Sequence, residues 1–142
     1  MTEVVFLDAN IFMYTAGKPH AYKLPCQHIL QAVEIAQLPA ATNAEVLQEL
    51  LYRYHHLHLL DKGVQLCRYI LDYPLMVLPV TPADVSSAFN LMSQNNDTNL
   101  PPRDAIHAAT MQNNNITRIL TADKHFDQIT GIQRLDPLTF AL

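Results

Sequence analysis

The apolar run Val4-Val5-Phe6-Leu7, which stops abruptly at Asp8, constrains the fold of this chain more than any other stretch. Its length and its β-branched residues favour a strand that is buried on both faces, as in parallel sheets covered by helices. Functional groups in such sheets collect where the strands end. We therefore predict a strand that brings Asp8 to a functional edge of a sheet, followed by a helix that Asn10 can cap.

Strand-like and helix-like patterns alternate along the rest of the chain. Short strands are expected at 40–41, 76–80, 119–120 and around 133–135. Helices are expected to open near Pro25, Thr42, Asp61, Thr81 and Arg103, with a helical turn around 125–126 and a polar loop over 93–102. This alternation predicts the α/β class, as a three-layer α/β/α sandwich with a short, mainly parallel central sheet.

Length and composition fit one ordinary folded unit. The chain has 142 residues, 49% of them hydrophobic, and we expect a single domain over 1–142. The net charge of -4 argues against binding nucleic acid by a basic surface, but leaves room for metal ions and a few placed basic residues. Cys26 and Cys67 lie in apolar helical patterns, which favours reduced core thiols over a disulfide. No apolar run approaches the roughly 20 residues that span a bilayer, so we expect a cytoplasmic protein.

Four acids stand at the ends of predicted elements: Asp8, Glu45, Asp104 and Asp123. In a parallel sheet the ends of strands and the starts of the next helices share one edge, so all four side chains can converge there. Each acid also has an ordinary structural use. Thr42 and Glu45 have capping-box spacing, Asp104 could cap its own helix, and Asp8 or Asp123 could make an Asx turn.

Clustered carboxylates repel one another and are usually held together by a divalent cation. Ligands that are all oxygen atoms point to Mg²⁺ or Mn²⁺. Such an ion can activate a water molecule and neutralise the charge that develops on a phosphate. The four acids therefore predict a phosphodiester-hydrolysing site.

The chain resembles the PIN-domain ribonucleases, in particular the small VapC-type toxins of toxin–antitoxin modules. The resemblance is carried by residues 6–12 (FLDANIF), 42–49 (TNAEVLQE), 103–109 (RDAIHAA) and 120–127 (LTADKHFD). It implies a metal-dependent endoribonuclease that leaves a 5′ phosphate, an antitoxin that covers the site, and a homodimer. By the same resemblance, the catalytic and metal-binding acids are Asp8, Glu45, Asp104 and Asp123, supported by Asn10, Thr121 and Asp127.

Several further residues have both a functional and a structural interpretation. Glu49, one turn past Glu45, is either a further acid of the pocket or a helix-surface residue, and His107 could reach the pocket but fits a supporting or core role better. Arg103, Lys124 and Arg53 could bind RNA phosphate or be solvated charges. A histidine cluster could bind a metal but is more typical of solvated surface; it comprises His55, His56 and His58.

Three alternatives compete with a PIN nuclease. A phosphatase of the haloacid dehalogenase type would need Asp-x-Asp at the first strand, where this chain has Asn10 in the third position. A receiver domain would need an aspartate after the third strand, where this chain has Pro79-Val80. The remaining alternative is a non-catalytic PIN fold that only binds RNA or a partner protein. RNA cleavage by the purified protein distinguishes it from an enzyme.

Overall fold

A five-stranded sheet forms the centre of the protein in the computed structural model, which describes residues 3–142 apart from the side chain of Thr98. The strand order is β3-β2-β1-β4-β5, and every neighbouring pair runs parallel. The strands are β1 (Val5–Leu7), β2 (Ala40–Asn43), β3 (Met76–Leu78), β4 (Arg118–Leu120) and β5 (Gln133–Leu135). The predicted α/β class and parallel sheet are confirmed.

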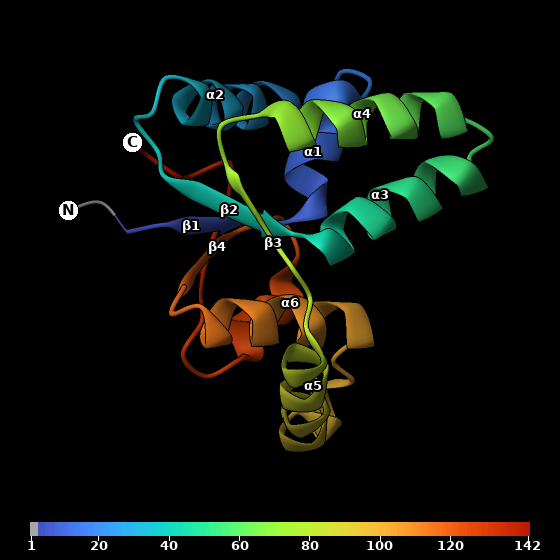
Figure 1. Cartoon of the computed structure of the whole chain (residues 1–142). Helices are drawn as coiled ribbons and strands as arrows, with labels where there is room; N and C mark the ends of the chain where they lie inside the picture. Colours follow the sequence, from blue (N-terminus) through green and yellow to red (C-terminus); the bar gives the residue numbers. More distant parts are fainter. Residues whose placement is uncertain (1–2) are drawn as a thin grey trace.

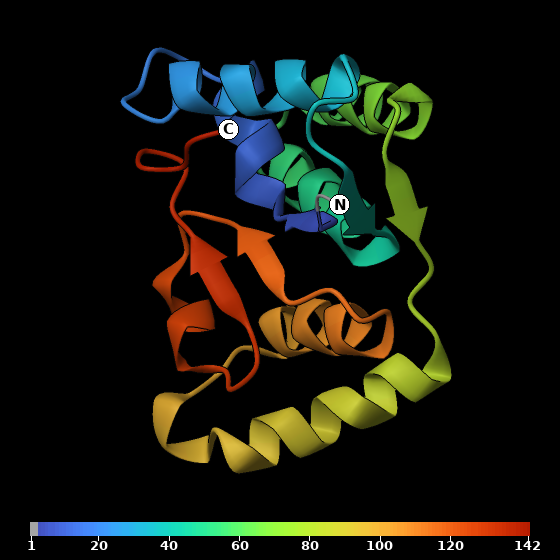
Figure 2. The same cartoon turned by 90° about the vertical axis from the view of Figure 1, so that its left-hand side faces the viewer.

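Helices cover both faces of this sheet. They are α1 (Ala9–Ala16), α2 (Lys23–Glu34), α3 (Ala44–His56), α4 (Leu60–Asp72), α5 (Pro82–Gln94) and α6 (Pro102–Asn113), with two 3₁₀ helices, η1 (Asn96–Thr98) and η2 (Lys124–Gln128). In Figure 1, α1, α2 and α4 lie above the sheet, α5 and α6 lie below it, and α3 extends from the end of β2. The view turned by 90° shows the same three layers (Figure 2). None of the helices in residues 3–142 is long and apolar enough to cross a membrane.

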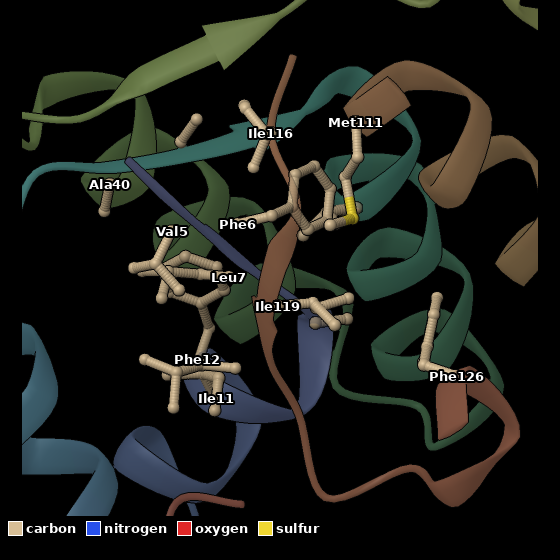
Figure 3. Close-up of a cluster of buried hydrophobic side chains, with 14 of the residues drawn as sticks. Val5, Phe6, Leu7, Ile11, Phe12, Ala40, Met111, Ile116, Ile119 and Phe126 are labelled. Carbon is tan, nitrogen blue, oxygen red and sulfur yellow. The ribbon is translucent and has the colours of Figure 1, made fainter. Parts of the chain in front are cut away.

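The central strand β1 is buried on both faces, as its apolar run predicts. Val5, Phe6 and Leu7 are fully buried. Figure 3 shows Phe6 pointing toward Met111 of α6, while Val5 points to the opposite side of the sheet. Alternate residues of one strand therefore fill the cores above and below the sheet, which holds the end of β1 in a fixed position.

The helix starts near the strand ends differ from those predicted. Asp8, and not Asn10, caps α1, because the Asp8 carboxylate accepts a hydrogen bond from the Ala9 N–H at 2.8 Å. Asn43 caps α3 through the Val46 N–H at 3.0 Å. The proposed capping box of Thr42 and Glu45 is therefore wrong.

Three further boundaries differ from the predictions. Helix α2 begins at Lys23, two residues before Pro25. Helix α6 is preceded by Pro101 at its cap position, so Asp104 lies inside the first turn and does not cap the helix. The expected loop over 93–102 is also partly wrong, because α5 continues to Gln94 and η1 follows. By contrast, Thr81 caps α5 in a complete capping box with Asp84, as that sequence indicates.

Candidate active site

The candidate site lies where the order of the strands in the sheet reverses. From β1 the chain builds β2 and β3 on one side, then returns to the other side of β1 to build β4 and β5. The carboxyl ends of β1 and β4 therefore border the switch point of the sheet, the usual binding place in open parallel sheets. Leu7 pairs with Leu120, which puts Asp8 beside Thr121.

Asp8 is held in one orientation at this switch point. Its side chain is only 6% exposed, and its Oδ1 accepts the Ala9 N–H. Its Oδ2 accepts the Thr121 hydroxyl at 2.8 Å and the Asn10 amide at 3.4 Å. Asn10 also donates to the Thr121 hydroxyl oxygen at 2.8 Å. Burial raises the pKa of Asp8 and outweighs the opposing effect of His107, so this carboxylate lacks full compensation of its charge.

Asp104 and Asp123 meet from two different elements. Asp104 is in the first turn of α6, and Asp123 caps η2 by accepting the His125 N–H at 2.9 Å. Burial, followed by the charges of Asp123 and Asp8, raises the pKa of Asp104 to about 6. Asp104 is thus close enough to both Asp123 and Asp8 for their charges to act on it.

His125 lies between two of these aspartates. Its Nδ1 is 3.1 Å from Oδ2 of Asp104 and 3.0 Å from Oδ1 of Asp123. Partial burial lowers the pKa of His125, but the two carboxylates more than offset this effect, and the pKa is raised. The ring is about half exposed.

Helix α3 brings Glu49 close to Asp8. The fully buried His107 of α6 directs its Nε2 at Glu49 Oε1, 3.2 Å away, and lies 3.7 Å from Asp8 Oδ1. Burial lowers the pKa of His107, but the hydrogen bond to Glu49 and the Asp8 charge raise it more strongly. Arg103, half exposed, contacts Glu49 at 3.5 Å. His107 Nδ1 has no hydrogen-bond partner among residues 3–142.

Glu45 lies one helical turn before Glu49, and the two differ in their surroundings. Both line a cleft of about 580 Å³, together with Asp104, Asp123 and His125. Glu45 is partly buried, and its side chain makes no hydrogen bond or ion pair within the described part of the chain. The structure therefore puts Glu49, and not Glu45, against Asp8.

The remaining predicted residues do not line this cleft. Asp127 is in η2 and forms an ion pair with Arg134 at 2.8 Å, and Arg134 also donates to the Thr121 carbonyl oxygen at 3.2 Å. Lys124 is exposed at the start of η2. The His55, His56 and His58 cluster lies at the far end of α3, and no group that could hold a metal is found there in residues 3–142.

The donor atoms fit a divalent cation. Two groups of side chains have donor atoms within 4.8 Å of one another: Asp8, Glu49 and His107, and Asp104, Asp123 and His125. Burial, and after it the neighbouring carboxylates, raise the pKa of Asp8 and Asp104, so a cation beside them would stabilise their charged forms. Carboxylate oxygens are the ligands preferred by Mg²⁺ and Mn²⁺. The site can therefore hold such an ion.

Glu49, His107 and His125 contribute more to the site than their sequence patterns predict. The sequence indicates that Glu49 and His107 can reach the pocket. Helical spacing does not distinguish Glu45 from Glu49, because both lie on the same side of α3. The sequence patterns predict no functional role for His125. Its signal was its position two residues after Asp123, which is the spacing of a tight turn that returns the ring to the carboxylate.

Comparison with known proteins identifies the family. The PIN domain family model matches residues 5–132. Ribonuclease VapC13 from Mycobacterium tuberculosis is 33% identical over 132 residues, 93% of this chain and 99% of that protein. Ribonuclease VapC23 of the same species is 33% identical over 123 residues, 84% and 93% of the two chains.

Solved structures show the same fold at low identity. VapBC2 from Rickettsia felis matches with a TM-score of 0.74 and 16% identity, over 94% of this chain and 98% of that one. The M. tuberculosis toxin VapC20 matches with a TM-score of 0.73 and 16% identity, over 90% and 98%. The chain therefore belongs to the PIN domain family and, within it, to the VapC group.

Proposed function

We propose that this protein is a metal-dependent endoribonuclease that hydrolyses RNA phosphodiester bonds. The observation that carries the proposal is the convergence of four carboxylates at the switch point of the sheet. They come from the end of β1, from α3, from α6 and from the cap of η2, and are Asp8, Glu49, Asp104 and Asp123. The names of the relatives, which are VapC ribonucleases, support RNA as the substrate.

The acids would hold the cation, and their neighbours would hold the acids. A bound Mg²⁺ or Mn²⁺ supplies Lewis acidity and a water molecule of lowered pKa. Asp8 is kept in place by Thr121 and Asn10, so its oxygens need no reorganisation when charge develops nearby. Arg103 and Lys124 lie beside the acids and are exposed, which suits contacts with the phosphates of the RNA on either side of the cleaved bond.

The sequence resemblance assigned the α3 ligand to Glu45, whereas we propose Glu49 as the main α3 ligand. Glu49 is hydrogen-bonded to the buried His107 and acts electrostatically on Asp8. Glu45 remains a prediction, as an acid on the wall of the same cleft. Its position one turn away suits a water-mediated contact with the ion or with substrate.

The decisive measurement is cleavage of a mixed RNA by the purified protein with Mg²⁺ or Mn²⁺, and with a chelator. We expect cleavage that needs the metal. Asp104→Asn and Glu49→Gln should each lower the rate by about 100-fold or more, since loss of even an indirect metal partner costs about 10- to 100-fold. Glu45→Gln should lower it less than Glu49→Gln does.

Asp72→Asn is the matched control, because Asp72 is an exposed acid at the end of α4. It should cleave like the parent. If Asp104→Asn and Glu49→Gln also cleave like the parent while remaining folded, the proposed site is wrong. If the folded parent does not cleave any RNA with either metal, the non-catalytic binding module becomes the better interpretation.

We further propose that the protein is the toxin of a toxin–antitoxin pair. The antitoxin would cover the cleft, and the toxin itself would be a homodimer. Several of the solved structures with this fold are VapBC toxin–antitoxin complexes, for example VapBC-5 from M. tuberculosis. Expression of this chain alone should arrest growth, and Asp104→Asn should relieve the arrest. Size-exclusion chromatography with light scattering tests the dimer.

A further inference from the structure

The imidazole of His125 faces two acids of the candidate metal site with the same ring nitrogen. Nδ1 is 3.1 Å from Asp104 Oδ2 on α6 and 3.0 Å from Asp123 Oδ1, at the cap of η2. The His125 backbone N–H donates to the same Asp123 oxygen at 2.9 Å. One short turn therefore places the carboxylate and the ring together.

One ring nitrogen serves two carboxylates in this placement. An imidazole Nδ1 carries at most one hydrogen, so two oxygens at 3.1 and 3.0 Å can only share it in a bent, three-centre hydrogen bond. A cation between the three atoms would satisfy all of them. Neighbouring ligands on an octahedral ion with bonds of about 2.1 Å are separated by about 3.0 Å. The two distances from Nδ1 to the carboxylate oxygens, 3.1 and 3.0 Å, are close to this value.

We propose that His125 is a nitrogen ligand of the metal ion and biases the site toward first-row transition ions, represented by Mn²⁺, over Mg²⁺. The inference rests on the proposed metal-dependent function and deepens it. Mg²⁺ binds through oxygen and keeps much of its water, whereas imidazole nitrogen is a ligand for transition ions. A single nitrogen donor beside Asp104 and Asp123 thus distinguishes the two kinds of ion.

The exposure of the ring agrees with this role. The His125 side chain is 51% exposed and lines the cleft, so its nitrogen can reach an ion that enters from solvent. His107 also has a nitrogen near acids, but it is fully buried and its Nε2 already hydrogen-bonds Glu49. Among these two histidines, only His125 faces the open side of the site.

The test is Mn²⁺ binding to the metal-free full chain, followed by pulsed electron paramagnetic resonance for coupling of the bound ion to ¹⁴N. We expect one bound Mn²⁺ species with ¹⁴N coupling in the parent. His125→Gln should keep bound Mn²⁺ but lose the coupling, and the ratio of Mn²⁺ to Mg²⁺ affinity, measured by titration calorimetry, should fall about tenfold. His28→Gln is the control, because His28 is an exposed histidine on α2.

The outcomes separate this inference from the proposed function. Bound Mn²⁺ without ¹⁴N coupling in the parent makes His125 a hydrogen-bond partner only, and it overturns the inference while leaving the metal site intact. Coupling that persists in His125→Gln comes from another nitrogen and also overturns it. If the parent binds no Mn²⁺ at all, the proposed metal site fails together with the inference.

Discussion

Thr121 is the residue that joins the acids of the two central strands. Its hydroxyl donates to Asp8 Oδ2 at 2.8 Å, and its oxygen accepts from the Asn10 amide at 2.8 Å and from the Asp123 N–H at 3.0 Å. It is fully buried. A single hydroxyl therefore fixes the orientation of Asp8 and the start of the turn that carries Asp123.

Thr121→Val keeps the shape of this side chain and removes its hydrogen bonds. We expect the free energy of unfolding to fall by about 1–3 kcal/mol, because buried polar partners lose a hydrogen bond. Cleavage of RNA should fall by about 10- to 100-fold, the usual effect of removing a group that orients a metal ligand. Urea unfolding and initial cleavage rates measure the two effects.

Two variants make the test specific to the hydroxyl. Thr121→Ser keeps the hydroxyl and should cleave close to the parental rate. Thr117→Val changes an exposed threonine just before β4 and should leave both quantities unchanged. Parental cleavage by Thr121→Val would show that Asp8 does not depend on this contact.

At the residue scale, the sequence is a better guide to which residues come together than to which of their atoms are in contact. Asp8, Asp104 and Asp123 were expected at one edge because strand ends and helix starts share that edge, and they do act on one another. The choice between Glu45 and Glu49 depended on how α3 leaves β2. That direction is set by the packing of α3 against α4, α1 and α6, which no local sequence pattern contains.

Among the elements, the hairpin of α3 and α4 determines where Glu49 lies. The two helices approach closely at Gly63, where an added Cβ would lie 2.7 Å from the Cβ of Tyr54. Contacts of that length between such atoms require the helix backbones to move apart, because neither atom can rotate away. Tyr54 and Glu49 belong to the same helix, so a shift at the contact is transmitted to the site.

Gly63→Ala tests this contact. Alanine should improve the intrinsic helix propensity by about 1 kcal/mol, but overpacking of a tight contact costs about 1–3 kcal/mol. We expect the steric cost to prevail and the melting temperature to fall. Gln65→Ala, at an exposed position of α4, should change stability by less than about 0.5 kcal/mol. A Gly63→Ala protein that is more stable than the parent would contradict the close approach.

Element boundaries were predictable where the chemistry is local. Thr81-Pro82-Ala83-Asp84 forms the capping box that its residues indicate. The start of α1 was not predictable, because Asp8 and Asn10 are both good caps and only the pairing of β1 with β4 puts Thr121 beside Asp8. The parallel sheet followed from the buried character of β1, whereas its strand order required the structure.

On the scale of the whole molecule, we expect the cluster of acids to lower the free energy of unfolding unless a cation is bound. Asp104 has an ordinary pKa of 3.8 and a folded-state pKa of about 6, raised by burial and by Asp123 and Asp8. Between these two values the folded protein binds more protons than the unfolded chain does. The free energy of unfolding contributed by Asp104 therefore falls as pH rises from about 4 to about 6.

The raised pKa values of His107 and His125 also make the free energy of unfolding fall as the pH rises, but over a higher pH range. Their contribution is complete below the ordinary histidine value of 6.5 and is lost as the pH rises through their folded-state pKa. Metal binding depends on pH in the opposite direction. Ligands must lose their protons to bind a cation, so binding becomes stronger as the pH rises. Stability and metal affinity thus change in opposite directions with pH.

Asp104→Asn tests this balance in urea unfolding at pH 4.5, 6.0 and 7.5, with a chelator and with millimolar Mn²⁺. Without metal at pH 7.5 the variant should be more stable than the parent by about 1–3 kcal/mol, because the variant does not bury this charge. The difference should shrink toward pH 4.5, where Asp104 is protonated in the folded parent. With Mn²⁺ the order should reverse at pH 7.5, since only the parent has the full ligand set. Asp72→Asn should have the stability of the parent under all these conditions. If the parent and Asp104→Asn are equally stable in chelator at pH 7.5, the acids are not held in mutual repulsion.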